Sequence, residues 1–158
     1  MPRSYRAAFN GTLANAGGDA DMLSVQPADD KPIELKGAKF GQTSELGDSA
    51  EEQLRVSLMR LPATFTVGSG GSAVTPPPDD SADTACGATV IANDTTVATT
   101  SGSAVTPEEF SINIRAPYES WWPEEKVKVK QGEGLVWRCQ STPADDISAQ
   151  WTGMLIEQ

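Results

Sequence analysis

The stretch that decides the fold is Gly134-Leu-Val-Trp-Arg-Cys-Gln-Ser-Thr-Pro-Ala-Asp-Asp-Ile-Ser-Ala-Gln-Trp-Thr-Gly-Met-Leu-Ile-Glu-Gln158. Its first part, Leu135–Cys139, alternates with the two-residue period of a β-strand. Ser141–Asp146 predicts a turn, because proline fixes φ and aspartate side chains bond to nearby backbone N–H groups. A second extended segment runs from Ile147 to Ile156, so the stretch predicts two strands in a closing hairpin.

The end of this second segment is apolar on both faces. Trp151 and Leu155 share one face, and Met154 and Ile156 share the other. Such a strand is typical of the centre of a sandwich or of a surface covered by a neighbouring subunit. We therefore expect Trp151, Met154 and Ile156 to belong to a partner interface.

Similar alternation along the chain predicts roughly eight to ten short strands and no helix with a sustained period. In the segment that begins at Ile33, the apolar parity switches at Gly37, which predicts a β-bulge or bend there. The clearest predicted strands are Tyr5–Phe9, Met22–Gln26, Ile33–Phe40, Glu51–Arg60, Thr64–Val67, Phe110–Ile114 and Val127–Val129.

Residues 68–109 are rich in Gly, Ser, Thr, Pro and Asp and predict a long loop or arm. A structureless loop of that length is uncommon in a compact domain, so we place a strand near Ala88–Ala92. The sequence also allows a second strand near Thr96–Thr99. Taken together, the pattern predicts one all-β domain over residues 1–158, an antiparallel β-sandwich of jelly-roll type with long loops.

Composition excludes several classes of function. The net charge of −10 argues against a nucleic-acid surface and against an anionic membrane surface. The chain has no histidine, which removes histidine-based metal sites and Ser-His-Asp catalysis. No signal peptide or membrane-spanning run is recognisable, so we expect synthesis in the host cytoplasm. For Cys86 and Cys139 we favour two thiols over a disulfide.

Adjacent acidic residues recur along the chain, but they fall in predicted turns and at strand starts, where acids favour solubility and turn geometry. A glycosidase needs two carboxylates facing one cleft, and this pattern does not favour one. Asp19 with Asp21, or Asp79 with Asp80 and Asp83, offers oxygen ligands for Ca²⁺ without the spacing of a calcium loop. We expect no enzyme activity and no cofactor.

Two further patterns bear on assembly. Gly71-Ser-Ala-Val-Thr-Pro76 recurs as Gly102-Ser-Ala-Val-Thr-Pro107, and we expect the copies to occupy equivalent, neighbouring places. Trp121 and Trp122 lie in a loop bounded by Pro117 and Pro123. That loop either caps the end of the sandwich or forms an aromatic anchor, since tryptophan is enriched at the centre of interfaces.

Six segments of the chain form a recognisable set. They are Gly41-Gln-Thr-Ser-Glu45, Gly47-Asp-Ser-Ala-Glu-Glu-Gln-Leu-Arg-Val-Ser-Leu58, Gly68-Ser-Gly-Gly-Ser-Ala-Val-Thr-Pro-Pro-Pro78, Ala92-Asn-Asp-Thr-Thr96, Gly132-Glu-Gly-Leu-Val136 and Pro143-Ala-Asp-Asp146. Together they resemble a family of small proteins from tailed bacteriophages and prophages. The resemblance covers the chain from about residue 20 onward and implies a virion β-sandwich, most plausibly one that decorates a capsid. It carries no site residues.

The leading hypothesis is a non-enzymatic virion structural protein that forms homo-oligomers and binds the major capsid protein or another virion protein. Trp121 and Trp122 are the expected contact residues, together with the terminal strand. The alternatives are a carbohydrate- or host-surface-binding module and a self-polymerising tube or filament subunit, which oligomer geometry would separate from decoration.

Overall fold

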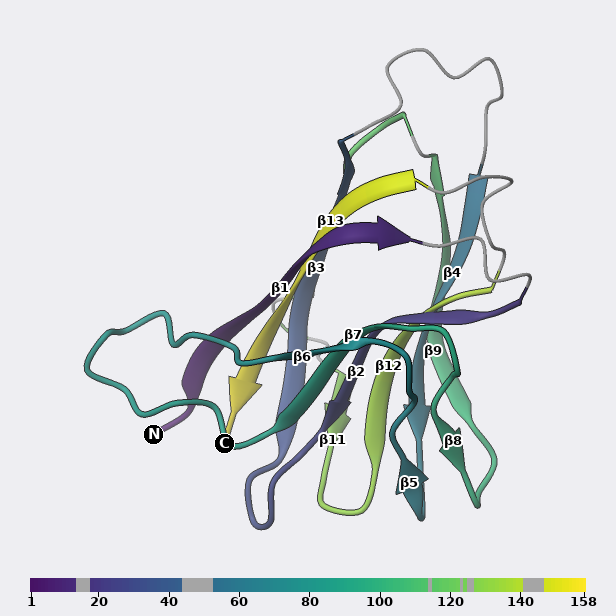
Figure 1. Ribbon diagram of the computed structural model, residues 1–158. Helices are drawn as coiled ribbons and strands as arrows, with labels where there is room; N and C mark the ends of the chain where they lie inside the picture. Colours follow the sequence, from purple (N-terminus) through teal and green to yellow (C-terminus); the bar gives the residue numbers. More distant parts are fainter. Residues whose placement is uncertain (14–17, 44–52, 114, 123, 125–126, 141–146) are drawn as a thin grey trace.

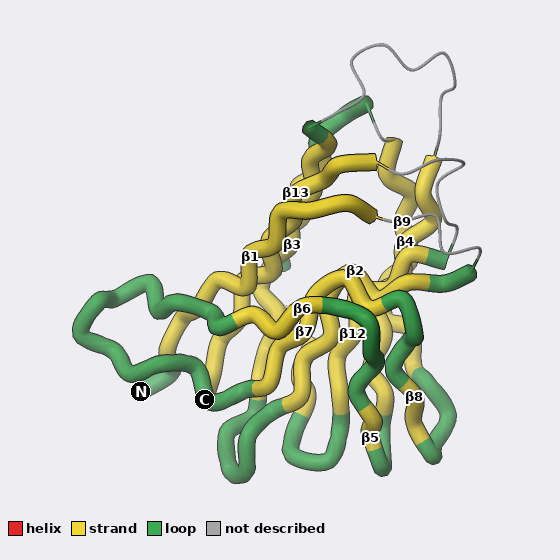
Figure 2. The backbone as a smooth tube through the Cα atoms, in the orientation of Figure 1, coloured by secondary structure: helices red, strands yellow, loops and turns green. Residues whose placement is uncertain are grey.

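The computed structural model describes residues 1–13, 18–43, 53–113, 115–122, 124, 127–140 and 147–158. Within these residues the chain forms thirteen strands and no helix, and neighbouring strands are antiparallel. Two sheets pack face to face around a shared apolar cluster, as in a β-sandwich (Figure 1, Figure 2). The prediction of an all-β fold with antiparallel sheets is confirmed.

One layer is a five-stranded sheet. Its centre is β13, which pairs with β1 on one side and β3 on the other. Two short strands share the far edge of β3. In order across the sheet the strands are β1 (Arg3–Leu13), β13 (Ile147–Glu157), β3 (Ile33–Gln42) and the pair β10 (Tyr118–Trp121) and β11 (Val127–Val129).

The second layer is a six-stranded sheet, and a small two-stranded sheet accompanies it. In order across the larger sheet the strands are β6 (Ser72–Val74), β7 (Thr89–Asp94), β2 (Ala20–Gln26), β12 (Gly134–Cys139), β4 (Gln53–Leu61) and β9 (Val105–Asn113). The small sheet joins β5 (Phe65–Thr66) to β8 (Thr99–Thr100). Phe65 and Ala98 form a second apolar cluster with Leu61 and Val136.

The predicted closing hairpin is wrong. β12 lies between β2 and β4 in one layer, whereas β13 lies between β1 and β3 in the other. Both segments are apolar enough to be central strands. If they formed one hairpin, both would lie in the same sheet, and the opposite sheet would have no strong apolar strand at its centre. The turn expected at residues 141–146 lies outside the described residues.

The bulge predicted at Gly37 is confirmed. Met154 is in register with Gly37 and Leu155 with Leu35, so Lys36 is the extra residue on β3. The extra residue reverses the strand parity. As a result Leu35 and Ala38 both face the core, although they are three positions apart.

Residues 68–109 hold more strand than expected. β7 confirms the strand placed near Ala88–Ala92, and the second strand is β8 instead of Thr96–Thr99. β6 and the first half of β9 were not predicted, because both are edge segments whose side chains are mostly exposed and therefore show no apolar alternation. The repeated hexapeptides contain these two edges, at opposite sides of the six-stranded sheet, so the expected side-by-side placement is wrong.

The segment 117–123 was predicted as a loop, but its middle is strand β10. Tyr118 is in register with Phe40, which is in turn in register with Trp151. Across the sandwich, Tyr118 stacks on Phe110 with ring centroids 4.5 Å apart. These aromatic contacts hold a four-residue segment in the sheet, although it is too short to show a period.

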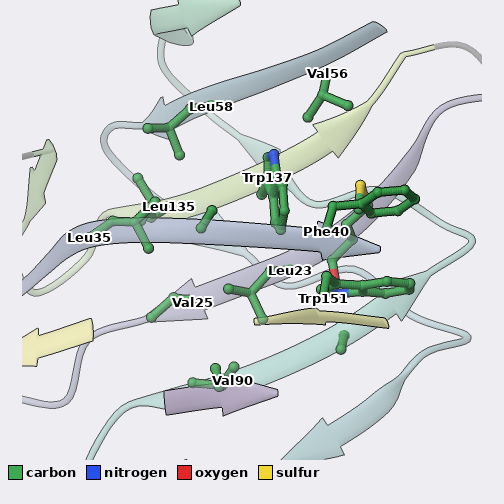
Figure 3. Packing of buried hydrophobic residues seen from close by; sticks show 14 of the residues in the cluster. Leu23, Val25, Leu35, Phe40, Val56, Leu58, Val90, Leu135, Trp137 and Trp151 are labelled. Carbon is green, nitrogen blue, oxygen red and sulfur yellow. The ribbon is translucent and has the colours of Figure 1, made fainter. Parts of the chain in front are cut away.

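The core lies between the two central strands (Figure 3). Trp151 is 1% exposed and donates its Nε1–H to the Met22 carbonyl of the opposite sheet at 2.6 Å. Trp137 is 2% exposed, and no acceptor for its Nε1–H lies among the described residues. The two buried indoles therefore differ in one hydrogen bond.

That difference yields a stability prediction. Trp151→Phe should lower the free energy of unfolding by about 1–3 kcal/mol more than Trp137→Phe does, because only the first change leaves a buried carbonyl without its donor. Urea denaturation followed by far-UV circular dichroism measures both variants. Equal losses would show that the inter-sheet hydrogen bond contributes nothing beyond ring volume.

Candidate binding surfaces

Trp121, the last residue of strand β10, and Trp122, which follows it, point to opposite sides. Because side chains alternate along a strand, Trp121 points out of the sandwich and Trp122 points toward the other layer. Trp121 is 45% exposed, whereas Trp122 is half-buried against the apolar core. The structure therefore separates a pair that the sequence had suggested would act together.

Trp121 is held firmly on the outer face of the five-stranded sheet. It is in register with Gly37, and a Cβ at that glycine would lie 3.2 Å from the indole Cε3, so the ring lies directly over the backbone. The indole Nε1–H donates to the Glu119 carboxylate. Lys39 Nζ lies 3.0 Å from the same carboxylate and 5.6 Å from the ring centroid.

These contacts determine the charge state of Glu119, the carboxylate beside the exposed ring. The hydrogen bond from Trp121, followed by that from Lys39, lowers the pKa of Glu119. The carboxylate is therefore ionised at neutral pH, and it satisfies both the indole N–H and the ammonium group. What Trp121 presents to a partner is an aromatic face with its polar edge already bonded.

A shallow groove lies on the same outer face, where Lys39 and Glu119, the two residues that contact the Trp121 ring, belong to its lining. It has a volume of about 560 Å³. In-register neighbours across four strands, Ala8, Thr152, Lys39 and Glu119, line its centre. The amide side chains of Asn10 and Gln150 lie at its far end. The face thus combines one aromatic ring with amide, hydroxyl and charged groups.

Trp122 faces a second groove, of about 710 Å³, where the edges of the two sheets meet at β9 and β11. The indole of Trp122 hydrogen-bonds to Glu108. Burial nevertheless raises the pKa of Glu108, because a charged carboxylate is disfavoured away from water. Val105, which is 42% exposed, lies on the rim.

The remaining expected interface residues are buried within the chain. Trp151 is in the core, and Met154 and Ile156, on the opposite face of β13, are 5% and 9% exposed. Their burial comes from this chain alone, so no neighbouring subunit is needed to cover them. Of the five residues expected at an interface, Trp121 is the exposed one.

Two buried carboxylates lie side by side on β2 and β7. Asp21 forms an ion pair with Arg138 Nε at 2.6 Å and accepts the Ala98 N–H at 2.7 Å. Asp94, in register with Asp21, accepts only neutral donors, Ser24 Oγ at 3.1 Å and the Gly71 N–H at 3.2 Å. Burial raises the pKa of both carboxyl groups, and each has a neighbouring aspartate that adds to the increase.

The calcium hypothesis finds no assembled site. Asp21 is engaged by Arg138, and Asp79 and Asp83 form ion pairs with Arg6 and Arg3. In the parts of the chain that the structure describes, no three His, Cys, Asp or Glu residues gather in a way that would hold a metal. Cys86 and Cys139 are not joined by a disulfide, as predicted.

Comparison with known proteins adds no identity. No family model, no curated protein and no solved structure matches the chain. Across the described residues, no helix has the length and apolar character needed to cross a membrane.

The unequal partners of the two buried aspartates predict a stabilising substitution. Asp94→Asn keeps acceptors and donors for Ser24 and Gly71 but removes the unpaired buried charge, so the free energy of unfolding at pH 7 should rise by roughly 1 kcal/mol. Asp21→Asn is the contrasting variant. It breaks a buried ion pair and should cost about 3–5 kcal/mol.

The pH dependence of these stabilities checks the cause. Because the pKa of Asp94 is raised in the folded protein, its favourable contribution is complete below the unfolded-state value of about 3.9 and is lost as the pH rises through the folded-state value. The advantage of Asp94→Asn over the native protein should therefore grow from pH 4 to pH 8 in urea denaturation. A constant advantage would show that charge is not the cause.

Proposed function

We propose that the protein is a non-enzymatic virion structural protein that decorates or stabilises a bacteriophage capsid. It acts through self-association and contacts with shell subunits. The observation that carries this proposal is the exposed Trp121, fixed on the outer face of the five-stranded sheet beside Lys39 and Glu119. Aromatic anchors with a polar rim are typical of protein–protein interfaces.

The charge of the chain supports an outward location on the particle. Twenty-two acidic and twelve basic residues give a net charge of −10, which favours a surface kept away from packaged DNA. After synthesis in the host cytoplasm the protein resides on the virion. Its partner there is the major capsid protein or another virion protein.

The strand connections support a jelly-roll-like sandwich for this role. β1, β2, β3 and β4 alternate between the two layers, and β11, β12 and β13 do so again. Such crossing connections are found in the jelly rolls of viral capsid proteins. Many copies on a repetitive shell also need only modest contact area each, because multivalent attachment raises the overall affinity.

Attachment through Trp121 is tested on particles. Trp121→Ala should reduce the copies retained on virions by roughly 10-fold or more, because the ring is the proposed central anchor. The virions come from the genome that encodes the chain, are banded on a density gradient, and are analysed by quantitative mass spectrometry. Trp121→Phe, which keeps an aromatic face, should retain most copies.

Native protein absent from banded virions would contradict the proposal as a whole. Equal retention of the native protein and Trp121→Ala would contradict only the assignment of Trp121. Unchanged urea denaturation of Trp121→Ala excludes misfolding as the reason for any loss.

A carbohydrate-binding module is the second candidate, favoured by the groove beside Trp121. An indole face next to amide and hydroxyl side chains suits a sugar ring, which is apolar on its faces and polar at its edge. Affinity electrophoresis in gels containing purified host lipopolysaccharide separates the candidates. Retardation that Trp121→Ala abolishes would favour this second function.

A further inference from the structure

Arg60 differs from every other arginine of the chain. The other five each have an interaction: Arg3, Arg6 and Arg138 with aspartates, Arg55 with Gln140, and Arg115 with a further group. Arg60 is half-buried, and its Nε is buried without an acceptor among the described residues. Burial of an unpaired guanidinium N–H is costly, so an acceptor from outside the chain would be stabilising there.

The surroundings of Arg60 indicate which kind of chemical group must carry that acceptor. Arg60 lines the groove between β9 and β11, where Trp122, Val127 and Pro107 supply apolar walls. Two described acids in or beside this groove are already engaged. Glu108 bonds to Trp122, and Glu34 lies 3.4 Å from Lys128 Nζ, on the groove wall. The groove therefore suits a carboxylate carried next to rigid apolar groups.

The chain itself carries such a segment at its opposite edge. Between β6 and β7 a loop projects well beyond the sheets (Figure 1). It contains Pro76-Pro-Pro-Asp-Asp80, and the rings of successive prolines hold an extended conformation with little entropy left to lose. Pro-rich segments of this kind bind aromatic-lined grooves.

Contacts with the body fix this loop, and one carboxylate remains available. The Arg6 N–H bonds to the Pro77 carbonyl at 3.2 Å, and the Gly87 N–H bonds to Glu157 at 2.8 Å. Asp79 is paired with Arg6. Asp80 is exposed and accepts only the Ala82 N–H, at 2.9 Å, among the described residues. Within the described part of the chain, Asp80 forms no ion pair.

We propose that the Pro77–Asp80 segment of one copy docks in the β9–β11 groove of a second copy, placing the Asp80 carboxylate on the Arg60 guanidinium and the proline rings against Trp122. This inference rests on the self-association part of the proposed function. An arginine–carboxylate pair gives the contact its geometry, and the shielded groove strengthens it. A second copy is the occupant because the chain carries both halves of the contact.

The two halves lie at opposite edges of the molecule, so the contact is head-to-tail. Pro78 pairs with Tyr5 at the β1 edge of the five-stranded sheet, whereas β11, beside the groove, lies at the other edge of that sheet. A head-to-tail contact produces a ring when the rotation closes and a filament when it does not.

The test is a pair of conservative variants analysed by size-exclusion chromatography with light scattering. Arg60→Gln removes the charge in the groove, and Asp80→Asn removes the charge on the loop while keeping the acceptor for Ala82. The native protein should form oligomers, and each variant alone should associate roughly 30-fold or more weakly. An equimolar mixture should form 1:1 dimers, because one intact groove meets one intact loop.

Further variants make the result specific. Lys130→Gln removes one positive charge from an exposed lysine outside the groove and should leave the oligomers unchanged. The charge-swapped double variant R60E/D80K should restore assembly. Unchanged urea denaturation of Arg60→Gln and Asp80→Asn confirms that both variants are folded. If Arg60→Gln is not folded, Arg60→Met, which has an uncharged side chain of similar length, replaces it.

Monomeric native protein, oligomers indifferent to both changes, or a mixture that stays monomeric would each overturn the inference. Retention on virions separates this failure from failure of the proposed function. Arg60→Gln leaves the Trp121 face intact, so a protein that attaches to particles without head-to-tail contacts would keep the proposed function and lose this inference.

Discussion

The central position of β13 is the constraint on which the rest of the structure depends. Its antiparallel ladder with β1 runs from Arg3–Glu157 to Leu13–Ile147, and on the other side it pairs with β3. The Nε1–H of Trp151 then joins this sheet to the Met22 carbonyl of the other layer. One strand therefore organises its own sheet and ties it to the second. Because both of its faces are covered, the end of the chain is part of the interior.

Strand parity decides which groups the surface presents. The bulge at Lys36 comes just before Gly37, which is in register with Trp121 on the neighbouring strand β10. Because Gly37 has no side chain, the Trp121 ring can lie over its backbone. The next residue, Trp122, then points toward the opposite sheet and lines the groove beside β9. A single β-bulge and a single glycine thus turn two adjacent tryptophans into two separate surfaces. One is open on a sheet face, and the other lines an edge groove.

Two copies of one six-residue sequence, Gly-Ser-Ala-Val-Thr-Pro, lie at the two edges of the six-stranded sheet. Each copy of Gly-Ser-Ala-Val-Thr-Pro contributes edge-strand residues and ends in a proline, at Pro76 beside β6 and at Pro107 within β9. Proline has no N–H for a further strand, and edge prolines oppose open-ended pairing. The β1 edge of the other sheet is covered by the chain near Pro78. Pairing of these edges with a further strand is thereby disfavoured.

The sequence by itself determined the all-β class, the strands with strong alternation and the bulge at Gly37, because these depend on side-chain period and local backbone freedom. It also predicted Trp121 and Trp122 as contact residues, and the structure leaves Trp121 exposed and Trp122 half-buried. Only the tertiary structure decided that β12 and β13 enter different sheets, because their apolar alternation is the same for either partner. It likewise decided that Met154 and Ile156 are buried within the chain and that the buried Nε of Arg60 lacks an acceptor among the described residues. Pairing partners and burial arise from contacts between residues distant along the chain, and no local pattern encodes them.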